Sequence, residues 1–422
     1  MREQILKASD SAKDLEALYR SAPKQFSEAF PTVYREAEAS PLLDAWHERL
    51  AYDLADTQRI QTKTPSWNAK DIYFTLLLIF IAGTFAKLPQ FIPELNSEFF
   101  YARNFPTTVI AAVMAFFLIQ RGCSLKTIGL LTSSVVLGLL YLNLIPPPEN
   151  SDTSLLACLH LPFAFWSLTG IAFLGGKWND QSGRMNYIRY NGELIIFTTV
   201  IVIGGMVLTG ITFALFNLIG LRIEEAYLNS VGHYGGVGAP LVATLLITRI
   251  IGERLRIAPL LAKLFTPLFL LMTSAYLVTM LVKQQSPFTN REFLIAFNGL
   301  LLIVLGLCVF SISERGKQKA RGPLDYMNIS LVSVTLAVDL IALAAILFRL
   351  TSYGFTPNRV AVLGANILAF CHLAGILVRY IQFLRKTNSF ESLELWIVRF
   401  LPAYTCWALI VAIVLPVLSR FK

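Results

Sequence analysis

Three side chains that can carry or relay a proton lie inside long apolar stretches. Asp339 lies in the run Val334–Ile341, which contains no other charge, and His372 and His160 lie in two further stretches. A charged group inside a membrane costs about 3 kcal/mol and usually faces the bundle interior or a wet cavity. Asp339 is therefore predicted to be a proton or cation site, with either histidine as a candidate partner in a relay.

Each of these polar residues also has a purely structural interpretation. A buried carboxyl can stay neutral and be hydrogen-bonded to a neighbouring helix, because burial alone confers no function on an acid such as Asp339. A lone histidine inside a membrane is commonly an interhelical hydrogen-bonding residue. The sequence leaves both interpretations open.

A glycine-rich segment forms a second unusual region. Glycines remove side-chain bulk and proline removes a backbone donor, so this helix start is predicted to be either unwound, as in broken transporter helices, or very closely packed. The four-residue spacing of Gly232 and Gly236 favours close packing. The segment comprises Gly232, His233, Gly235, Gly236, Gly238 and Pro240.

Four charged residues are predicted at the outer mouth of the membrane part. Gly354 permits a turn and Pro357 can begin a helix, so Arg349 and Arg359 flank a tight connection. Two guanidinium groups can bind a lipid phosphate or a carboxylate bidentately. The favoured alternative is that Arg359 holds Glu224, Glu225 or another outer loop. The predicted outer-mouth charges are Glu224, Glu225, Arg349 and Arg359.

Catalytic and metal-binding signals are weak. His233, Glu225 and the outer arginines form the only plausible catalytic constellation, and no nucleophile and base stand at diagnostic spacing. The five cysteines form no C-x-x-C pair. We predict no catalytic residues, no metal and no cofactor, and the sequence favours a protein that is not an enzyme.

The composition places these residues in a membrane protein. The chain has 422 residues, of which 55% are hydrophobic and 15% charged, and its mean hydropathy is +0.59. A bilayer core takes about 20 apolar residues of helix, and lipid offers backbone groups no hydrogen-bond partner, so the spans must be helical. We predict an all-α polytopic bundle of about 11 spans, within a range of 10–12. The predicted spans are Asp71 to Phe91, Pro106 to Gln120, Thr127 to Ile145, Ser154 to Gly175, Leu194 to Ile219, Gly232 to Thr248, Ile257 to Val282, Phe293 to Ser313, Ile329 to Phe348, Val360 to Phe383 and Leu395 to Leu418.

Charge distribution predicts the orientation. Lys and Arg concentrate in the even-numbered connections between spans, whereas the connection from Ile145 to Ser154 has none. Because basic residues collect in cytoplasmic loops, the N-terminus is predicted to be cytoplasmic and the C-terminus outside. The net charge of +9 is spread over these loops as partners for lipid headgroups, and it does not indicate nucleic-acid binding.

Residues 1–66 are predicted to form a small cytoplasmic helical head, and residues 67–422 the transmembrane domain. Apolar residues at helical spacing in the head indicate two or three amphipathic helices. Packing of this head on itself is favoured, and the alternative is a groove that docks a cytoplasmic protein partner. The apolar stripes are Leu15, Leu18 and Tyr19; Phe26, Phe30, Val33 and Tyr34; and Leu42, Leu43, Trp46, Leu50 and Leu54.

Several motifs resemble those of a family of bacterial membrane proteins, domain of unknown function 4153. They are Leu261–Leu268, Tyr276-Leu277, Ser286–Leu294 with Asn298, Arg184–Glu193 and Arg349–Arg359, the last being the most specific. The resemblance covers roughly residues 70–422. It implies a polytopic protein of the bacterial cytoplasmic membrane and carries no established activity.

Two classes of function remain. The number of spans, Asp339 and the glycine-rich segment favour a transporter or carrier for a small solute, ion or lipid. The alternative is a non-transporting scaffold or sensor whose head docks a cytoplasmic partner and whose spans bind membrane lipids. The sequence indicates neither a substrate nor an oligomeric state.

Overall fold

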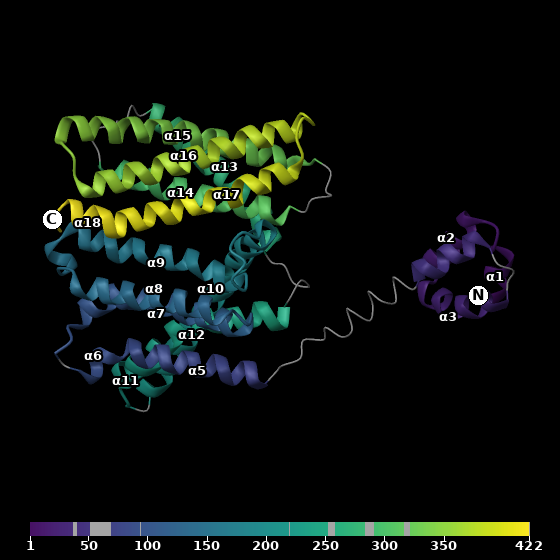
Figure 1. Ribbon diagram of the computed structural model, residues 1–422, viewed down its shortest axis with the longest axis horizontal. Coiled ribbons are helices and arrows are strands. Elements are labelled where there is room, and N and C mark those ends of the chain that lie inside the picture. Colours follow the sequence, from purple (N-terminus) through teal and green to yellow (C-terminus); the bar gives the residue numbers. More distant parts are fainter. Residues whose placement is uncertain are drawn as a thin grey trace. The chain divides into compact units, whose positions relative to one another are not determined.

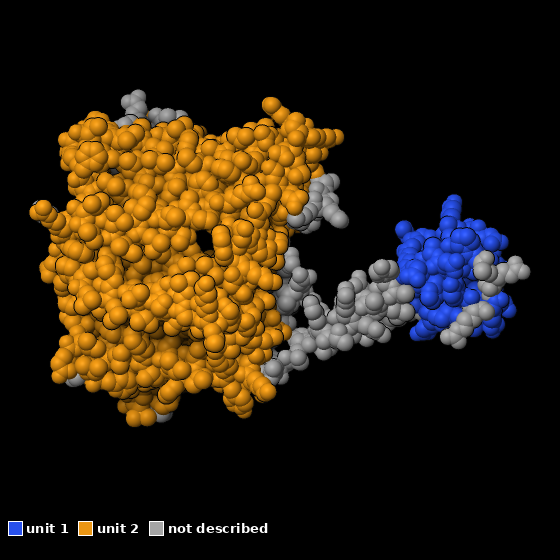
Figure 2. All heavy atoms as spheres, in the orientation of Figure 1, with its two compact units in different colours: residues 1–67 blue, residues 68–422 orange. Residues whose placement is uncertain are grey.

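The computed structural model describes residues 1–36, 40–50, 69–92, 94–218, 220–251, 258–282, 291–315 and 321–421. The chain forms two compact units, Met1–Trp67 and Asn68–Lys422, which are coloured separately in Figure 2. The predicted division after residue 66 falls outside the described ranges, as do Leu54, the span ends Ile219 and Ile257, and residues 286–290 of the family motifs.

The head is a small helical unit built around its own core. Its helices are α1 (Arg2–Lys7), α2 (Ala12–Ser21), α3 (Pro23–Glu36) and a helical stretch over residues 41–50. The predicted stripes supply most of its buried side chains, and α1, which the pattern did not indicate, adds another. The core consists of Ile5, Ala8, Leu15, Phe26, Phe30, Val33, Leu43, Trp46 and Leu50. The favoured expectation of self-packing therefore agrees with the structure.

The second unit is a bundle of long helices that lie side by side (Figure 1). The first predicted span falls on two helices, α5 and α6, and each of the other ten falls on a described helix or on a helix interrupted by π-helical turns. The helices are α5 (Ala69–Ala86), α6 (Leu88–Phe91), α7 (Ser97–Gln120), α8 (Leu125–Leu144), α9 (Asp152–Phe173), α10 (Gln181–Leu218), α11 (Glu224–Tyr227), α12 (His233–Leu245), α13 (Ala258–Val282), α14 (Arg291–Glu314), α15 (Pro323–Tyr353), α16 (Pro357–Leu384), α17 (Phe390–Leu409) and α18 (Leu415–Leu418). A short 3-10 turn, Pro148–Asn150, precedes α9, and the π-helical turns are Leu228–Gly232, Leu246–Ile251 and Ile410–Val414.

Length and hydropathy identify the bundle as membrane-spanning. Within the described residues, 9 helices are long and apolar enough to cross a bilayer. The other two predicted spans fall on α13 and α14, whose described apolar parts, Lys263–Val278 and Asn298–Glu314, are shorter. A protein with this many apolar helices is an all-α, multi-pass membrane protein.

Several helices are longer than the predicted spans, and α7 and α10 show the reasons. Helix α7 begins at Ser97, because the Asn96 side chain accepts the Glu98 and Phe99 N–H groups, and Pro106 lies inside this helix. Helix α10 has 38 residues, since its polar first turns continue into the predicted fifth span. Those turns bury Tyr187 and Tyr190 against protein, which a hydropathy pattern does not detect.

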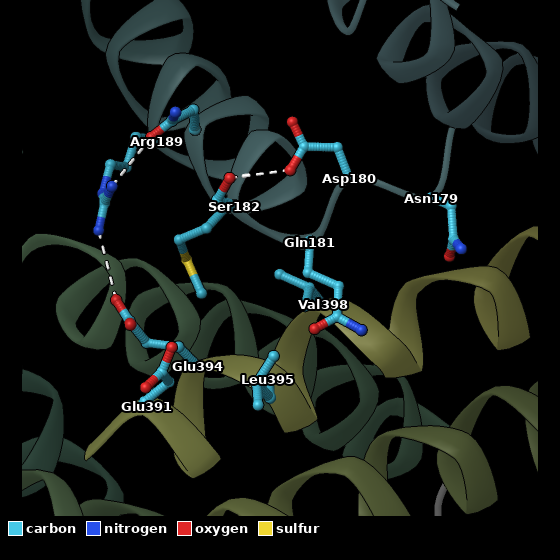
Figure 3. Close-up of a pocket in the computed structure, with 11 residues that line it drawn as sticks. Asn179, Asp180, Gln181, Ser182, Arg189, Glu391, Glu394, Leu395 and Val398 are labelled. Carbon is cyan, nitrogen blue, oxygen red and sulfur yellow. Dashed lines mark hydrogen bonds and ion pairs between the residues drawn. The ribbon is translucent and has the colours of Figure 1, made fainter. Parts of the chain in front are cut away.

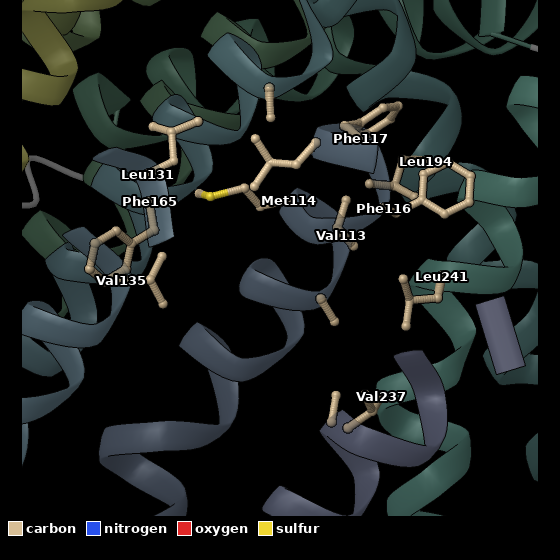
Figure 4. Close-up of a cluster of buried hydrophobic side chains, with 14 of the residues drawn as sticks. Val113, Met114, Phe116, Phe117, Leu131, Val135, Phe165, Leu194, Val237 and Leu241 are labelled. Atoms are coloured by element: carbon tan, nitrogen blue, oxygen red, sulfur yellow. The ribbon is translucent and has the colours of Figure 1, made fainter. Parts of the chain in front are cut away.

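Two hydrophobic cores hold the bundle together, and the start of α10 contributes to both. One core joins α5, α7, α8, α9 and α12 around residues such as Phe116, Phe117 and Leu241 (Figure 4). The other joins α14, α15, α16 and α17 around residues such as Leu331 and Tyr380. Helix α9 also packs against α17, which connects the two halves.

Successive long helices run in opposite directions, so α5, α10 and α15 begin at one end of the bundle and α18 ends at the other (Figure 1). The first end is where the sequence predicts the cytoplasm, and it is named the predicted inner end below. The opposite end is named the predicted outer end.

The connection between α15 and α16 has the form that its sequence predicts. Gly354 ends α15 with a φ of 79°, in the left-handed region that favours glycine. The Thr356 side chain then caps α16 by accepting the Arg359 N–H, and Pro357 occupies the first turn. This tight connection brings the outer end of α15 beside the start of α16.

Helices α16 and α17 approach closely at Gly375, which carries a testable prediction. A Cβ at this position would lie 2.2 Å from the Trp396 ring, and that ring is held by its Nε1–H bond to the His372 carbonyl. We expect Gly375→Ala to lower the free energy of unfolding by about 1–3 kcal/mol, because the helices must separate. Denaturant unfolding in detergent micelles measures this change.

Gly129→Ala is the matched control, since a Cβ at this position on α8 would meet nothing within 4 Å. It should be neutral or stabilising by up to about 1 kcal/mol, the helix propensity difference between the two residues. Equal effects of the two substitutions would contradict the close approach at Gly375.

Candidate functional site

Asp339 lies in the middle of α15 and is buried, with a relative exposure of 2%. Neither carboxyl oxygen has a hydrogen-bond partner among the described residues. Its neighbours Val338 and Ala342 belong to a small apolar cluster with Tyr276 of α13 and Val362 of α16. The structural interpretation of this residue required a hydrogen bond to another helix, and the described part of the structure contains none.

The two intramembrane histidines are held by other groups. His372 Nδ1 lies 3.0 Å from the Tyr404 hydroxyl, and its ring stacks on Phe400 at 4.6 Å between centroids. His160 Nδ1 lies 2.9 Å from the Leu156 carbonyl oxygen of its own helix. The structure does not join Asp339 to either histidine by a hydrogen bond, and no relay of the three is present among the described residues.

Arg349 and Arg359 come together at the predicted outer end, where they line one cavity of about 450 Å³. We name this cavity the arginine pocket. Arg359 Nη1 donates to the carbonyl oxygens of Tyr353 and Gly354 at 2.9 and 2.7 Å, so it fixes its own turn rather than an acidic loop. The pocket is lined by Asp152, Ile295, Asn298, Ile346, Arg349, Thr356, Asn358, Arg359 and Val362.

The predicted outer acidic pair lies elsewhere. Glu224 accepts a hydrogen bond of 2.9 Å from Asn217 at the end of α10, and Glu225 is exposed. Neither lines the arginine pocket. Since the two ring nitrogens of His233 face the Tyr101 hydroxyl and the Leu228 carbonyl, His233 has no nitrogen left for Glu225. The one catalytic constellation that the sequence offered is therefore not assembled.

The glycine-rich segment is helical, and a π-helical turn precedes it. A Cβ added to Gly236 would lie 3.5 Å from Phe105, and a Cβ added to Gly238 would lie 3.4 Å from Ile79. Gly235 has nothing within 4 Å, and Gly232 meets only its own Leu228. Pro240 lies inside α12, and its carbonyl oxygen accepts the Thr244 hydroxyl at 2.7 Å.

A buried polar network at the predicted inner end joins α14, α15 and α16. Arg315 Nε and Nη2 donate to the two oxygens of Asp325 at 2.6 and 2.9 Å. The Tyr380 hydroxyl and the Gly322 N–H donate to the same carboxylate at 2.8 and 2.9 Å. The Arg315 guanidinium also lies over the rings of Phe383 and Phe390.

The sequence does not predict this network, because Arg315 lies in a basic connection between spans, where it indicates only the orientation. Asp325 lies in the first turn of α15, a position at which the sequence gives no reason to expect a buried carboxylate. Tyr380 lies 55 positions further along the chain. The available signal was an acidic residue and a basic residue facing each other across a short connection.

A second inner cavity, of about 570 Å³, lies between the start of α10 and the start of α17 (Figure 3). Arg189 at its wall donates to the Ser313 carbonyl oxygen at 2.7 Å and lies 3.4 Å from a Glu394 oxygen. At the rim, the Gly183 N–H and the Ser182 hydroxyl hold the pKa of Asp180 below its usual value. Because Arg189 and Asp180 already have partners in the protein, we interpret this cavity as a contact region between α10 and α17 rather than as a binding site.

A third inner cluster ties α5 and α7 to the π-helical turn after α12. Arg249 Nε lies 3.0 Å from an Asp71 oxygen, and Gln120 donates to the other Asp71 oxygen at 2.7 Å. Arg249 also donates to Gln120. The predicted inner end is thus fastened at several places by ion pairs.

The described residues contain no group of three or more His, Cys, Asp or Glu side chains that could hold a metal ion. Comparisons with family models, with curated proteins and with solved structures gave no match to the chain. The resemblance to the domain of unknown function 4153 family stays a prediction.

Proposed function

We propose that the chain is a membrane carrier for a small solute, ion or lipid, and that Asp339 takes up and releases a proton during its cycle. The observation that carries the proposal is the state of this carboxyl: it is buried in the middle of a span, and neither oxygen has a partner among the described residues. Intramembrane acids that are structural are normally paired or hydrogen-bonded.

Helix α15 carries two buried aspartates, Asp325 with a relative exposure of 3% and Asp339 with 2%. Asp325 is satisfied by an arginine, a tyrosine hydroxyl and a backbone N–H. A fully bonded acid is suited to fastening helices, whereas an unbonded acid is free to exchange a proton.

The helices around Asp339 support a polar path. Helices α13, α14 and α16 all pack against α15, and each has buried side-chain polar atoms that lack a hydrogen-bond partner within the described structure. The arginine pocket lies at the outer end of the same helices, and the Asp325 network lies at the inner end. The buried polar atoms without a hydrogen-bond partner on α13, α14 and α16 are Thr273 Oγ1, Asn298 Oδ1, Asn366 Oδ1 and His372 Nε2.

Proton uptake into liposomes tests the proposal. The full chain is reconstituted with a pH-sensitive dye in the lumen, and a potassium diffusion potential drives protons inward. We expect uptake above that of empty liposomes, and we expect Asp339→Asn to lower the rate by about a hundredfold, as for removal of a positioned proton-transfer group.

Glu225→Gln is the matched control, because Glu225 is an exposed carboxylate on another helix. Its rate should equal that of the unchanged protein. Equal rates for Asp339→Asn and the unchanged protein would remove Asp339 from the mechanism. A folded, unchanged protein that gives no uptake above empty liposomes would count against the proposal as a whole.

A further inference from the structure

We propose that the arginine pocket is a binding site for the phosphate of an anionic phospholipid whose headgroup carries a hydroxyl. The chemistry that a lipid and free phosphate share is an anionic phosphate group, and the apolar wall of the pocket distinguishes the lipid from free phosphate. The inference concerns binding at one end of the bundle, and it stands whether or not the chain is a carrier.

The charge of the pocket favours an anion. Two arginines face one carboxylate, that of Asp152, and this carboxylate already accepts a hydrogen bond of 2.7 Å from Asn358. The pocket also lies at the starts of two long helices, α9 at Asp152 and α16 at Thr356. The backbone dipoles of both helices add positive potential at their N-termini.

Arg349 has a hydrogen-bond donor that a bound ligand would satisfy. Its Nη1 is buried and has no hydrogen-bond partner in the described structure. A buried guanidinium N–H without a partner is costly, and a phosphate oxygen satisfies it with a short, charge-assisted bond. The α15–α16 turn already holds the neighbouring Arg359 guanidinium, so this second phosphate-binding group is positioned before any ligand binds.

Two further features select among anions. Ile295, Ile346 and Val362 line the same cavity, so an apolar chain next to the phosphate has a surface to contact. Asn298 contributes a buried carbonyl oxygen that also lacks a partner in the described residues, and this acceptor calls for a donor on the ligand. A glycerol headgroup supplies that donor as a hydroxyl. Choline has no donor, and inorganic phosphate brings no apolar chain.

Calorimetric titration of the purified full chain in a neutral detergent tests the site. The probes are short-chain phosphatidylglycerol, short-chain phosphatidylcholine and inorganic phosphate. We expect phosphatidylglycerol to bind at least about tenfold more tightly than either other probe, since it alone offers the negative charge, the hydroxyl and the apolar chain together.

Two substitutions should act in opposite directions. Arg349→Gln removes a charge that makes no hydrogen bond within the described structure, so it should weaken phosphatidylglycerol binding by about tenfold or more without lowering the unfolding midpoint. Asp152→Asn removes the opposing charge and should strengthen the binding. Arg222→Gln, which alters an exposed arginine outside the pocket, is the matched control and should change nothing.

Three results would overturn the inference. They are equal binding of phosphatidylglycerol and phosphatidylcholine, equal binding of inorganic phosphate and the lipid, and unchanged lipid affinity in Arg349→Gln. None of these results bears on proton uptake through Asp339, so the site and the carrier function succeed or fail separately.

Discussion

Replacing Asp325 with asparagine is expected to lower the free energy of unfolding of the membrane unit by about 3–5 kcal/mol. Arg315 is only 8% exposed, and its Nε and Nη2 groups each donate a hydrogen bond to one oxygen of Asp325. Asparagine offers only one acceptor oxygen and no charge, so the guanidinium stays buried without its counter-ion. Chemical unfolding in micelles, followed by near-UV circular dichroism, measures the loss.

The double substitution Asp325→Leu with Arg315→Met separates a broken pair from a general loss of packing. Replacing both charges with apolar groups removes the guanidinium together with the carboxylate that faces it, so the double variant should be more stable than Asp325→Asn. A loss below about 1 kcal/mol in Asp325→Asn would show that solvent reaches this pair, because exposed pairs contribute only that much. Such a result would contradict the buried network.

The second large effect concerns Asp339 and has the opposite sign. Replacing it with valine should leave the membrane unit equally stable or more stable by about 1–3 kcal/mol, because the substitution removes a buried carboxyl that no described group satisfies. The same variant should lose proton uptake. A substitution that stabilises the fold and abolishes uptake identifies a group retained for function rather than for structure.

The two aspartates therefore form a matched pair on α15. Both are buried, both are replaced under the same conditions, and the sign of the stability change distinguishes them. If Asp339→Val destabilises the unit as strongly as Asp325→Asn does, Asp339 has a structural partner and the carrier proposal loses its support.

Much of the fold could be predicted from the sequence, because lipid forces apolar stretches to be helical. Asp71 to Phe91, for example, needed only hydropathy, although the helix breaks at Lys87 between α5 and α6. The turn after Tyr353 was also predictable, since glycine and proline restrict the backbone locally. Both features depend on residues that are neighbours in the chain.

What the sequence could not supply was the pairing of side chains from distant helices. Nothing in the local pattern joins Asp325 to Tyr380, or sets the Trp396 ring against Gly375. The same limit applies to Arg359: the sequence favours Glu224, Glu225 or another outer loop as its partner, and the observed partners are two carbonyl oxygens of its own turn. The prediction that Asp339 is a candidate proton site does not depend on distant contacts, because a charged residue in an apolar run is costly wherever the helix lies.

The most direct test of the account is the protonation of Asp339 itself. Infrared difference spectroscopy of the reconstituted protein detects the stretching band of a protonated carboxyl, and Asp339→Asn assigns that band to this residue. We expect a band that changes with pH and shifts promptly in D₂O, because a carrier must bring the group into contact with water. A band assigned to Asp339 that neither changes with pH nor exchanges would show a permanently dry, structural acid and would contradict the account.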